Sequence, residues 1–248
     1  MKKIKRALIS VSDKKNLKPL LSSLKKYKIE VISSGGTYKE IKKLGYKCTE
    51  ISDYTGSAEI LGGRVKTLHP KIHAGILNKR NNRSHHLDLK KNNFKNIDLV
   101  IVNFYPFEET LNKTTNHKKI IENIDVGGPT MVRAAAKNYN DVAVITSSSQ
   151  YEELKNELVK FKGSTSQEFR QKMSQIAFTE TAYYDALISK YLNEITHNIF
   201  PEKKIIFSNL IQELRYGENP HQKSALYSQN KSLNIKQLHG KQLSYNNY

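Results

Sequence analysis

The sequence has 248 residues, with 41 lysines and arginines against 23 aspartates and glutamates, so the formal net charge is +18. Apolar residues make up 38% of the chain, which is enough to bury a core and too many for a disordered protein. No apolar run approaches the roughly 18–20 residues of a membrane-spanning helix. The single cysteine, Cys48, excludes a disulfide within the chain. We therefore expect a cytoplasmic globular protein that contacts no membrane.

The positive charge allows two interpretations. Clustered basic side chains can release counterions from the phosphates of a nucleic acid. Here lysines greatly outnumber arginines, and they are spread along the chain in pairs such as Lys14-Lys15 and Lys90-Lys91, which is typical of solvated helix faces. We expect no specific nucleic-acid partner, and an anionic small-molecule substrate is compatible with either interpretation.

Apolar runs alternate with helical patterns through the first 147 residues. Residues 7–11, 30–33, 97–102 and 142–145 have the composition of buried strands, and leucines at 17, 20, 21 and 24 line one face of a helix. This alternation predicts a doubly wound parallel α/β sheet with right-handed crossovers. Beyond residue 147 only helical periodicity remains, over 150–161 and 167–192, and a turn-rich stretch begins near residue 200.

Polar loops follow the predicted strands, where open parallel sheets bind their ligands. Residues 10–14 combine small hydroxyl side chains with a lysine, and residues 33–37 combine small hydroxyl side chains with two glycines, each at a helix start. Together the two loops suit a phosphate cradle. Ordinary capping and turn formation explain the same residues equally well.

Three further loops contain groups that can take part in catalysis. Residues 62–70 combine glycines with Arg, Lys, Thr and His, residues 103–107 end a strand in an amide and a phenol, and Asp125 precedes a helix. Gathered round one crevice, Asp125, Lys137, Lys66 and Tyr105 would form a set of acid, base and polarising groups. Spacing alone does not show that they converge. The histidines at 69, 73, 85 and 86 lack a metal-ligand pattern, so we expect no metal site.

Segments 10–14, 34–37, 62–70, 73–77, 103–107 and 125–138 together resemble the inosine monophosphate (IMP) cyclohydrolase domain of the bifunctional AICAR transformylase/IMP cyclohydrolase family. The resemblance covers residues 7 to about 195 in the same order. It implies a methylglyoxal-synthase-like core over 1–147 and a helical extension over 148–199.

The resemblance continues into the second part of the family. Residues 214–222 and 238–247 resemble the opening of the transformylase domain, but the Lys-His-Xaa-Asn-Pro motif of that domain does not occur. We therefore expect residues 200–248 to be a truncated start of this domain, with Arg215 and Tyr216 as part of an AICAR site. The complete parent would use 10-formyltetrahydrofolate in its transformylase half and would form a homodimer.

The resemblance implies closure of 5-formamido-imidazole-4-carboxamide ribotide (FAICAR) to IMP with loss of water, the last step of de novo purine biosynthesis, without a metal or organic cofactor. Lys66 would polarise the formyl oxygen with help from Tyr105. Asp125 and Lys137 would form a coupled pair that moves the amide proton, and which of the two is the base stays open. The residues implied to bind the nucleotide are Ser12, Lys14, Ser34, Gly35, Gly36, Thr37, Arg64, Thr67, Asn103, Phe104, Val126 and Gly127.

Two other functions fit the same loops. One is a methylglyoxal-synthase-like lyase that acts on a triose phosphate. The other is a module that binds a nucleotide without catalysis.

Overall fold

A computed structural model describes residues 1–229 and 237–247 of the chain. These residues divide into two compact units, 1–188 and 189–248. The domain boundaries predicted near residues 147 and 200 stay a prediction, and residues 230–236 and 248 of the predicted last region lie outside the described residues.

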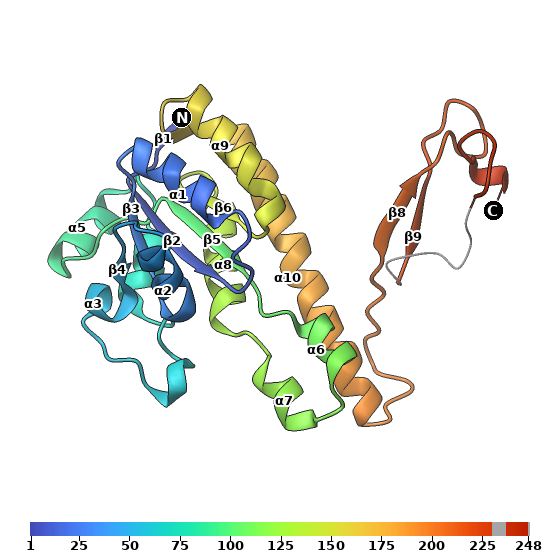
Figure 1. Cartoon of the computed structure of the whole chain (residues 1–248), viewed down its shortest axis with the longest axis horizontal. Helices are drawn as coiled ribbons and strands as arrows, with labels where there is room; N and C mark the ends of the chain where they lie inside the picture. Colours follow the sequence, from blue (N-terminus) through green and yellow to red (C-terminus); the bar gives the residue numbers. More distant parts are fainter. Residues whose placement is uncertain (230–236, 248) are drawn as a thin grey trace. The chain divides into compact units, whose positions relative to one another are not determined.

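The first unit is built on a five-stranded parallel sheet with the order β4-β3-β2-β5-β6 (Figure 1). Its strands are β2 (Arg6–Val11), β3 (Glu30–Ser33), β4 (Thr49–Glu50), β5 (Leu99–Asn103) and β6 (Ala143–Ile145). Four of them are the predicted strands, which confirms the α/β class. The edge strand β4 has two residues and therefore carries no periodic signal. A separate antiparallel pair joins β1 (Lys2–Lys3) to β7 (Ser164–Thr165).

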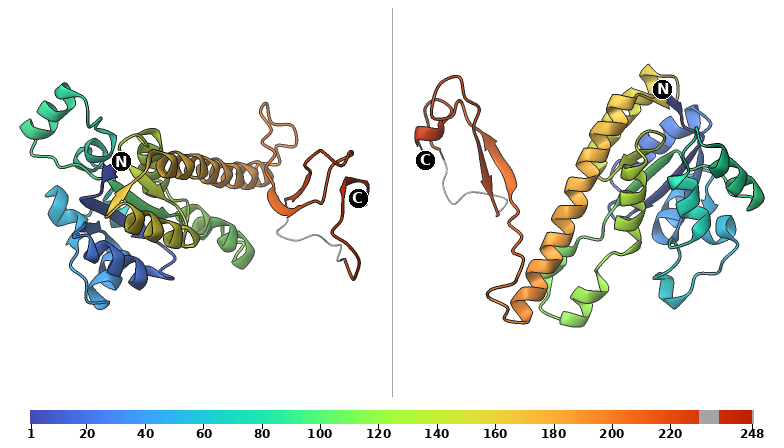
Figure 2. Two further views of the ribbon diagram at one scale, coloured as in Figure 1. Left: turned by 90° about the horizontal axis from the view of Figure 1, so that it is seen from above. Right: turned by 180° about the vertical axis from the view of Figure 1, so that it is seen from behind.

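Helices cover both faces of this sheet (Figures 1 and 2). In chain order they are α1 (Leu17–Lys26), α2 (Gly35–Lys43), α3 (Ile51–Thr55), α4 (Pro70–Leu77), α5 (Arg83–Lys91), α6 (Phe107–Lys113), α7 (His117–Glu122), α8 (Gly127–Lys137), α9 (Tyr151–Lys160) and α10 (Gln167–Ile195). Short 3₁₀ turns are η1 (Leu61–Gly63), η2 (Ser148–Gln150) and η3 (Tyr245–Asn247). Helix α1 packs against α9, and α4 packs against α8.

The core lies between these helices and the sheet. The four leucines predicted on one face of α1 are buried, and Pro19 falls in the first turn of that helix, where it breaks no helical hydrogen bond. In β5 the residues from Leu99 to Val102 are buried, as expected of a central strand that is covered on both faces. The predicted helices at 150–161 and 167–192 correspond to α9 and α10.

The register of the sheet brings the loops of interest together. Strands β2 and β5 are neighbours, and Val11 pairs with Asn103 at their carboxyl ends. Strand β3 lies on the other side of β2 and runs parallel to it. The loops that leave β2, β3 and β5 therefore start side by side at one edge of the sheet.

The second unit contains a two-stranded antiparallel ribbon of β8 (Asn209–Glu213) and β9 (Ala225–Ser228). The backbone N–H of Arg215 donates to the carbonyl of Leu243 at 2.8 Å, which ties the segment after β8 to the region before η3. Across both units, none of the described helices is long and apolar enough to cross a membrane.

Candidate active site

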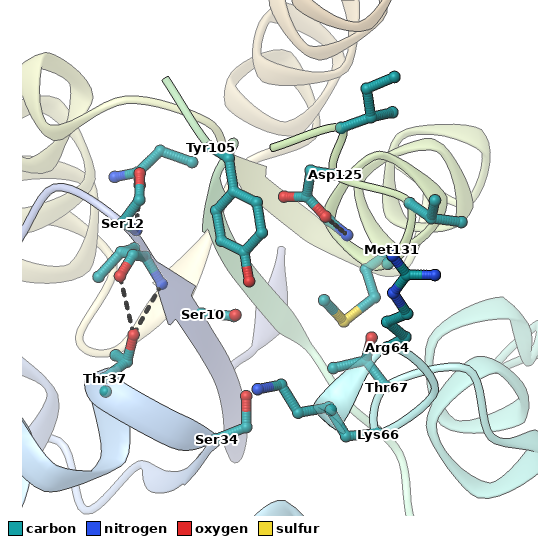
Figure 3. Close-up of a pocket in the computed structure, with 18 of the residues that line it drawn as sticks. Ser10, Ser12, Ser34, Thr37, Arg64, Lys66, Thr67, Tyr105, Asp125 and Met131 are labelled. Carbon is teal, nitrogen blue, oxygen red and sulfur yellow. Dashed lines mark hydrogen bonds between the residues drawn. The ribbon is translucent and has the colours of Figure 1, made fainter. Parts of the chain in front are cut away.

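The loops at the carboxyl edge of the sheet enclose a cavity of about 730 Å³ (Figure 3). This volume falls in the range of small-molecule sites, and the position is where open α/β sheets bind ligands. The lining comes from the ends of β2, β3 and β5, the first turns of α2 and α8, and the segments 62–67 and 121–126.

Asn103 organises the loop after β2. Its side-chain oxygen accepts hydrogen bonds from the backbone N–H groups of Ser12 at 2.6 Å and Asp13 at 3.1 Å. The Ser12 hydroxyl donates to the carbonyl of Phe104 at 2.7 Å. The two neighbouring loops are therefore fixed to each other before any ligand binds.

Two lysines approach the first turn of α2. Gly36 is exposed, and a Cβ atom built on it would lie 3.8 Å from the Lys14 Nζ. Gly35 has φ of +51°, and a Cβ atom there would lie 3.1 Å from the Lys66 Nζ. Two ammonium groups beside a helix N-terminus and exposed backbone N–H groups suit an anion such as a phosphate.

Thr37 lies in the same turn, but its hydroxyl forms hydrogen bonds to the backbone of β2. The Thr37 Oγ1 accepts from the Val11 N–H at 3.0 Å and donates to the Val11 carbonyl at 2.9 Å (Figure 3). The side chain is 4% exposed. Thr37 therefore joins α2 to the end of β2.

Asp125 lies just before α8 with its carboxyl at the cavity. One carboxyl oxygen accepts from the Gly128 N–H at 2.8 Å, and the backbone N–H of Tyr105 faces the same carboxyl. Burial raises the pKa of this carboxyl above its ordinary value of 3.8, although both N–H groups and the Lys66 ammonium oppose the shift. A carboxyl with a raised pKa is suited to taking up and returning a proton.

Charged side chains from three segments surround the remaining space. The Lys66 ammonium lies 3.3 Å from a carboxyl oxygen of Glu59, and Arg64 pairs with Glu122 of α7. The Arg64 guanidinium lowers the pKa of the Glu122 carboxyl by hydrogen bonding. Figure 3 shows the Tyr105 ring and the Lys66 chain pointing into the same space.

The structure brings most of the expected site residues to this cavity. Those that line it are Ser12, Lys14, Ser34, Gly36, Thr37, Arg64, Lys66, Thr67, Asn103, Tyr105, Asp125, Val126 and Gly127. Gly35 adjoins the lining at the start of α2, and the Phe104 ring instead packs on Tyr184 at a centroid distance of 5.0 Å.

Lys137 does not join the cavity. It is the exposed last residue of α8, whereas Asp125 lies just before the first turn of the same helix. Eleven residues of α-helix span about 15 Å. Within one copy of this chain, the expected pair of Asp125 and Lys137 is therefore not formed.

The residues expected in a partial AICAR site lie in the second unit. The Arg215 guanidinium packs over the Tyr216 ring at 4.8 Å, and its Nη2 donates to the Tyr216 hydroxyl at 3.2 Å.

Three lining residues were not expected from the sequence: Ile121, Glu122 and Ile124. The other lining residues lie in loops that the sequence had singled out; they are Ser10, Val11, Gly62, Gly63, Gly128 and Met131. Met131 lies one helical turn after Gly127 and Gly128, so helical spacing places it on the same face as these two glycines. Glu122 is the last residue of the six-residue α7 and Ile124 follows that helix, which is too short to show a hydrophobic period.

Among residues 1–229 and 237–247, no group of three or more His, Cys, Asp or Glu side chains is placed to hold a metal ion.

A parallel sheet with loops suited to an anion at its carboxyl edge is typical of α/β domains that bind a nucleotide or another phosphate compound. The MGS-like domain family matches residues 16–130, and the AICARFT/IMPCHase bienzyme family matches residues 135–248. The chain belongs to the AICARFT/IMPCHase bienzyme family, which confirms the resemblance seen in the sequence.

Relatives support this assignment. The chain is 48% identical over 248 residues to the bifunctional purine biosynthesis protein PurH of Elusimicrobium minutum (strain Pei191), covering 99% of this chain and 48% of that protein. It is 48% identical over 252 residues to the PurH protein of Acetivibrio thermocellus, covering 98% and 49%. A solved structure described as the crystal structure of ForH matches with a TM-score of 0.67 and 30% identity, over 75% of this chain and 97% of that one. The chain spans about half the length of the curated relatives it matches.

Proposed function

We propose that the cavity binds FAICAR and closes it to IMP with loss of water. The observation that carries this proposal is the position of Asp125, a carboxyl with raised pKa, in a cavity that also holds the Lys66 ammonium and an anion-suited helix start. The family membership of the chain supports the same reaction.

The nucleotide would bind with its phosphate at the start of α2, near Lys14 and Gly36. Its imidazole would then reach towards Lys66, Tyr105 and Asp125. Both reacting groups belong to one molecule, so most of the rate gain comes from orientation and from a preorganised electrostatic environment.

The chemistry needs a proton acceptor and a partner for the developing negative charge. The carboxamide nitrogen attacks the formyl carbon and loses one proton, which Asp125 accepts. Negative charge on the formyl oxygen is stabilised by the Lys66 ammonium, with the Tyr105 hydroxyl as a hydrogen-bond donor. Asp125 then returns its proton to this oxygen, which becomes a hydroxyl group. The proton of the formamide nitrogen is transferred to that hydroxyl, the C–O bond breaks to release water, and the ring C=N bond forms. No electrons are transferred, and we expect neither a metal nor an organic cofactor.

The test is turnover of FAICAR to IMP by the purified chain, followed by ultraviolet absorbance. Asp125→Asn should lower kcat by about 10²–10⁴-fold, the usual contribution of a positioned acid–base group. Asp53→Asn is the matched control, because Asp53 is an exposed carboxylate of α3 that does not line the cavity. Equal rates for wild type and Asp125→Asn would contradict the proposed role.

Other properties expected from the resemblance stay predictions. They are formylation of AICAR with 10-formyltetrahydrofolate by the complete protein, a contribution of Arg215 and Tyr216 to that site, homodimer formation and cytoplasmic localisation.

A further inference from the structure

Tyr184 of the long helix α10 contacts the backbone of the segment that leads into Asp125. Its side chain is buried, at 5% exposure. The Tyr184 hydroxyl accepts a hydrogen bond from the backbone N–H of Asp125 at 2.8 Å and donates to the carbonyl of Asn123 at 3.3 Å. One phenol therefore fixes the peptide groups that lead into Asp125.

The ring of the same tyrosine contacts the loop after β5. Its centroid lies 5.0 Å from that of Phe104 and 6.1 Å from that of Phe107, the latter in an edge-to-face arrangement. These two residues flank the segment that carries Tyr105. The ring contacts the loop after β5 and the hydroxyl bonds to the segment that leads into Asp125, so both loops meet at Tyr184.

Burial keeps this phenol in its neutral form. The pKa of Tyr184 is raised to about 12 by desolvation, so its hydroxyl retains the proton that it donates to Asn123. A neutral phenol can accept one hydrogen bond and donate another at the same time, and both bonds here are made to backbone groups.

We propose that Tyr184 is a positioning residue, which holds Asp125 and Tyr105 in the orientation needed for ring closure. This inference rests on the proposed function. Tyr184 does not line the cavity itself, and its hydroxyl acts through the peptide of Asp125, which does. A displacement of about 1 Å at a reacting group costs up to roughly 10²-fold in rate, so loss of this anchor should lower kcat more than it changes substrate binding.

The experiment compares Tyr184→Phe with Tyr151→Phe in the full 248-residue chain. Tyr151 of α9 is a matched control, because it is 3% exposed and its hydroxyl has no hydrogen-bond partner among the residues described. For Tyr184→Phe we expect a kcat lowered about 10- to 100-fold with KM within about threefold of wild type. Amide exchange at Asp125 should become faster in this variant. Tyr151→Phe should leave kcat, KM and this exchange rate unchanged.

Several results would overturn the inference. One is a Tyr184→Phe protein with kcat within twofold of wild type, which would make Tyr184 a packing residue only. Another is unchanged amide exchange at Asp125. If Tyr184→Phe does not fold, Phe107→Leu is the alternative variant, because it loosens the same ring contact and keeps the Tyr184 hydroxyl. An unchanged kcat in Phe107→Leu would then overturn the positioning role of Tyr184. If the wild type does not convert FAICAR, the proposed function fails, and amide exchange at Asp125 still decides whether Tyr184 fixes this loop.

Discussion

Gly128→Ala should displace the Asp125 carboxyl without removing it. A Cβ atom on Gly128 would lie 2.4 Å from the Asp125 Oδ2 and 2.9 Å from its Cγ, whereas ordinary contact begins near 3.4 Å. The carboxyl must therefore move by about 1 Å, and a displacement of this size at a catalytic group costs up to roughly 10²-fold in rate. The move also weakens the 2.8 Å hydrogen bond from the Gly128 N–H.

The assay for this change is steady-state cyclisation of FAICAR well below the melting temperature. We expect kcat to fall about 100-fold for Gly128→Ala, with a smaller change in KM. The following Pro129 restricts helical backbone at residue 128, so a loss of a few degrees in Tm is also expected. Gly36→Ala is the comparison, because its Cβ atom meets nothing closer than 3.8 Å. It should fold normally and raise KM, since the new methyl group occupies ligand space. A Gly128→Ala enzyme with kcat within twofold of wild type would refute this reasoning.

Three further changes test other parts of the site. Thr37→Val should lower the free energy of unfolding by about 2–4 kcal/mol, because it leaves the buried N–H and carbonyl of Val11 without their partner. Thr37→Ser keeps both hydrogen bonds and is the control. Denaturant unfolding measures the difference, and equal stability of the two variants would refute this prediction. Asp125→Asn should be more stable than wild type at neutral pH. The raised pKa of Asp125 means that the folded state binds the proton more tightly, so wild-type stability falls as pH rises above 3.8, and melting curves should converge below that pH. Glu59→Gln should release the Lys66 ammonium from its ion pair with Glu59 and tighten IMP binding by at most about fivefold, since half-exposed ion pairs contribute up to roughly 1 kcal/mol. Calorimetric titration measures the change, and weaker binding would contradict this prediction.

Much of the fold could be predicted because its signals are local. The strand at 97–102 is nearly all apolar, and the leucines of α1 repeat at helical spacing, so both patterns follow from burial alone. Parallel topology then places the ends of the strands at one edge, which is why loops far apart in sequence could be expected to meet. The two-residue β4 and the five- to nine-residue helices between residues 51 and 122 gave no comparable signal.

The direction of a side chain was not predictable from residue type. Thr37 has the hydroxyl expected of a phosphate ligand, yet that hydroxyl bonds to Val11. Lys137 has the charge expected of a catalytic base, yet it lies at the far end of α8 from Asp125. Tyr184 could be expected to pack in the core, but its hydrogen bond to a residue 59 positions away depends on how α10 crosses the unit.

The central claim is that this cavity closes a purine ring. The most direct measurement incubates the purified chain with FAICAR and, separately, with a triose phosphate, and identifies each product by mass and absorbance. We predict IMP from FAICAR, formed with loss of one water, and no conversion of the triose phosphate. A folded chain that leaves FAICAR unchanged, or that converts the triose phosphate instead, would contradict it.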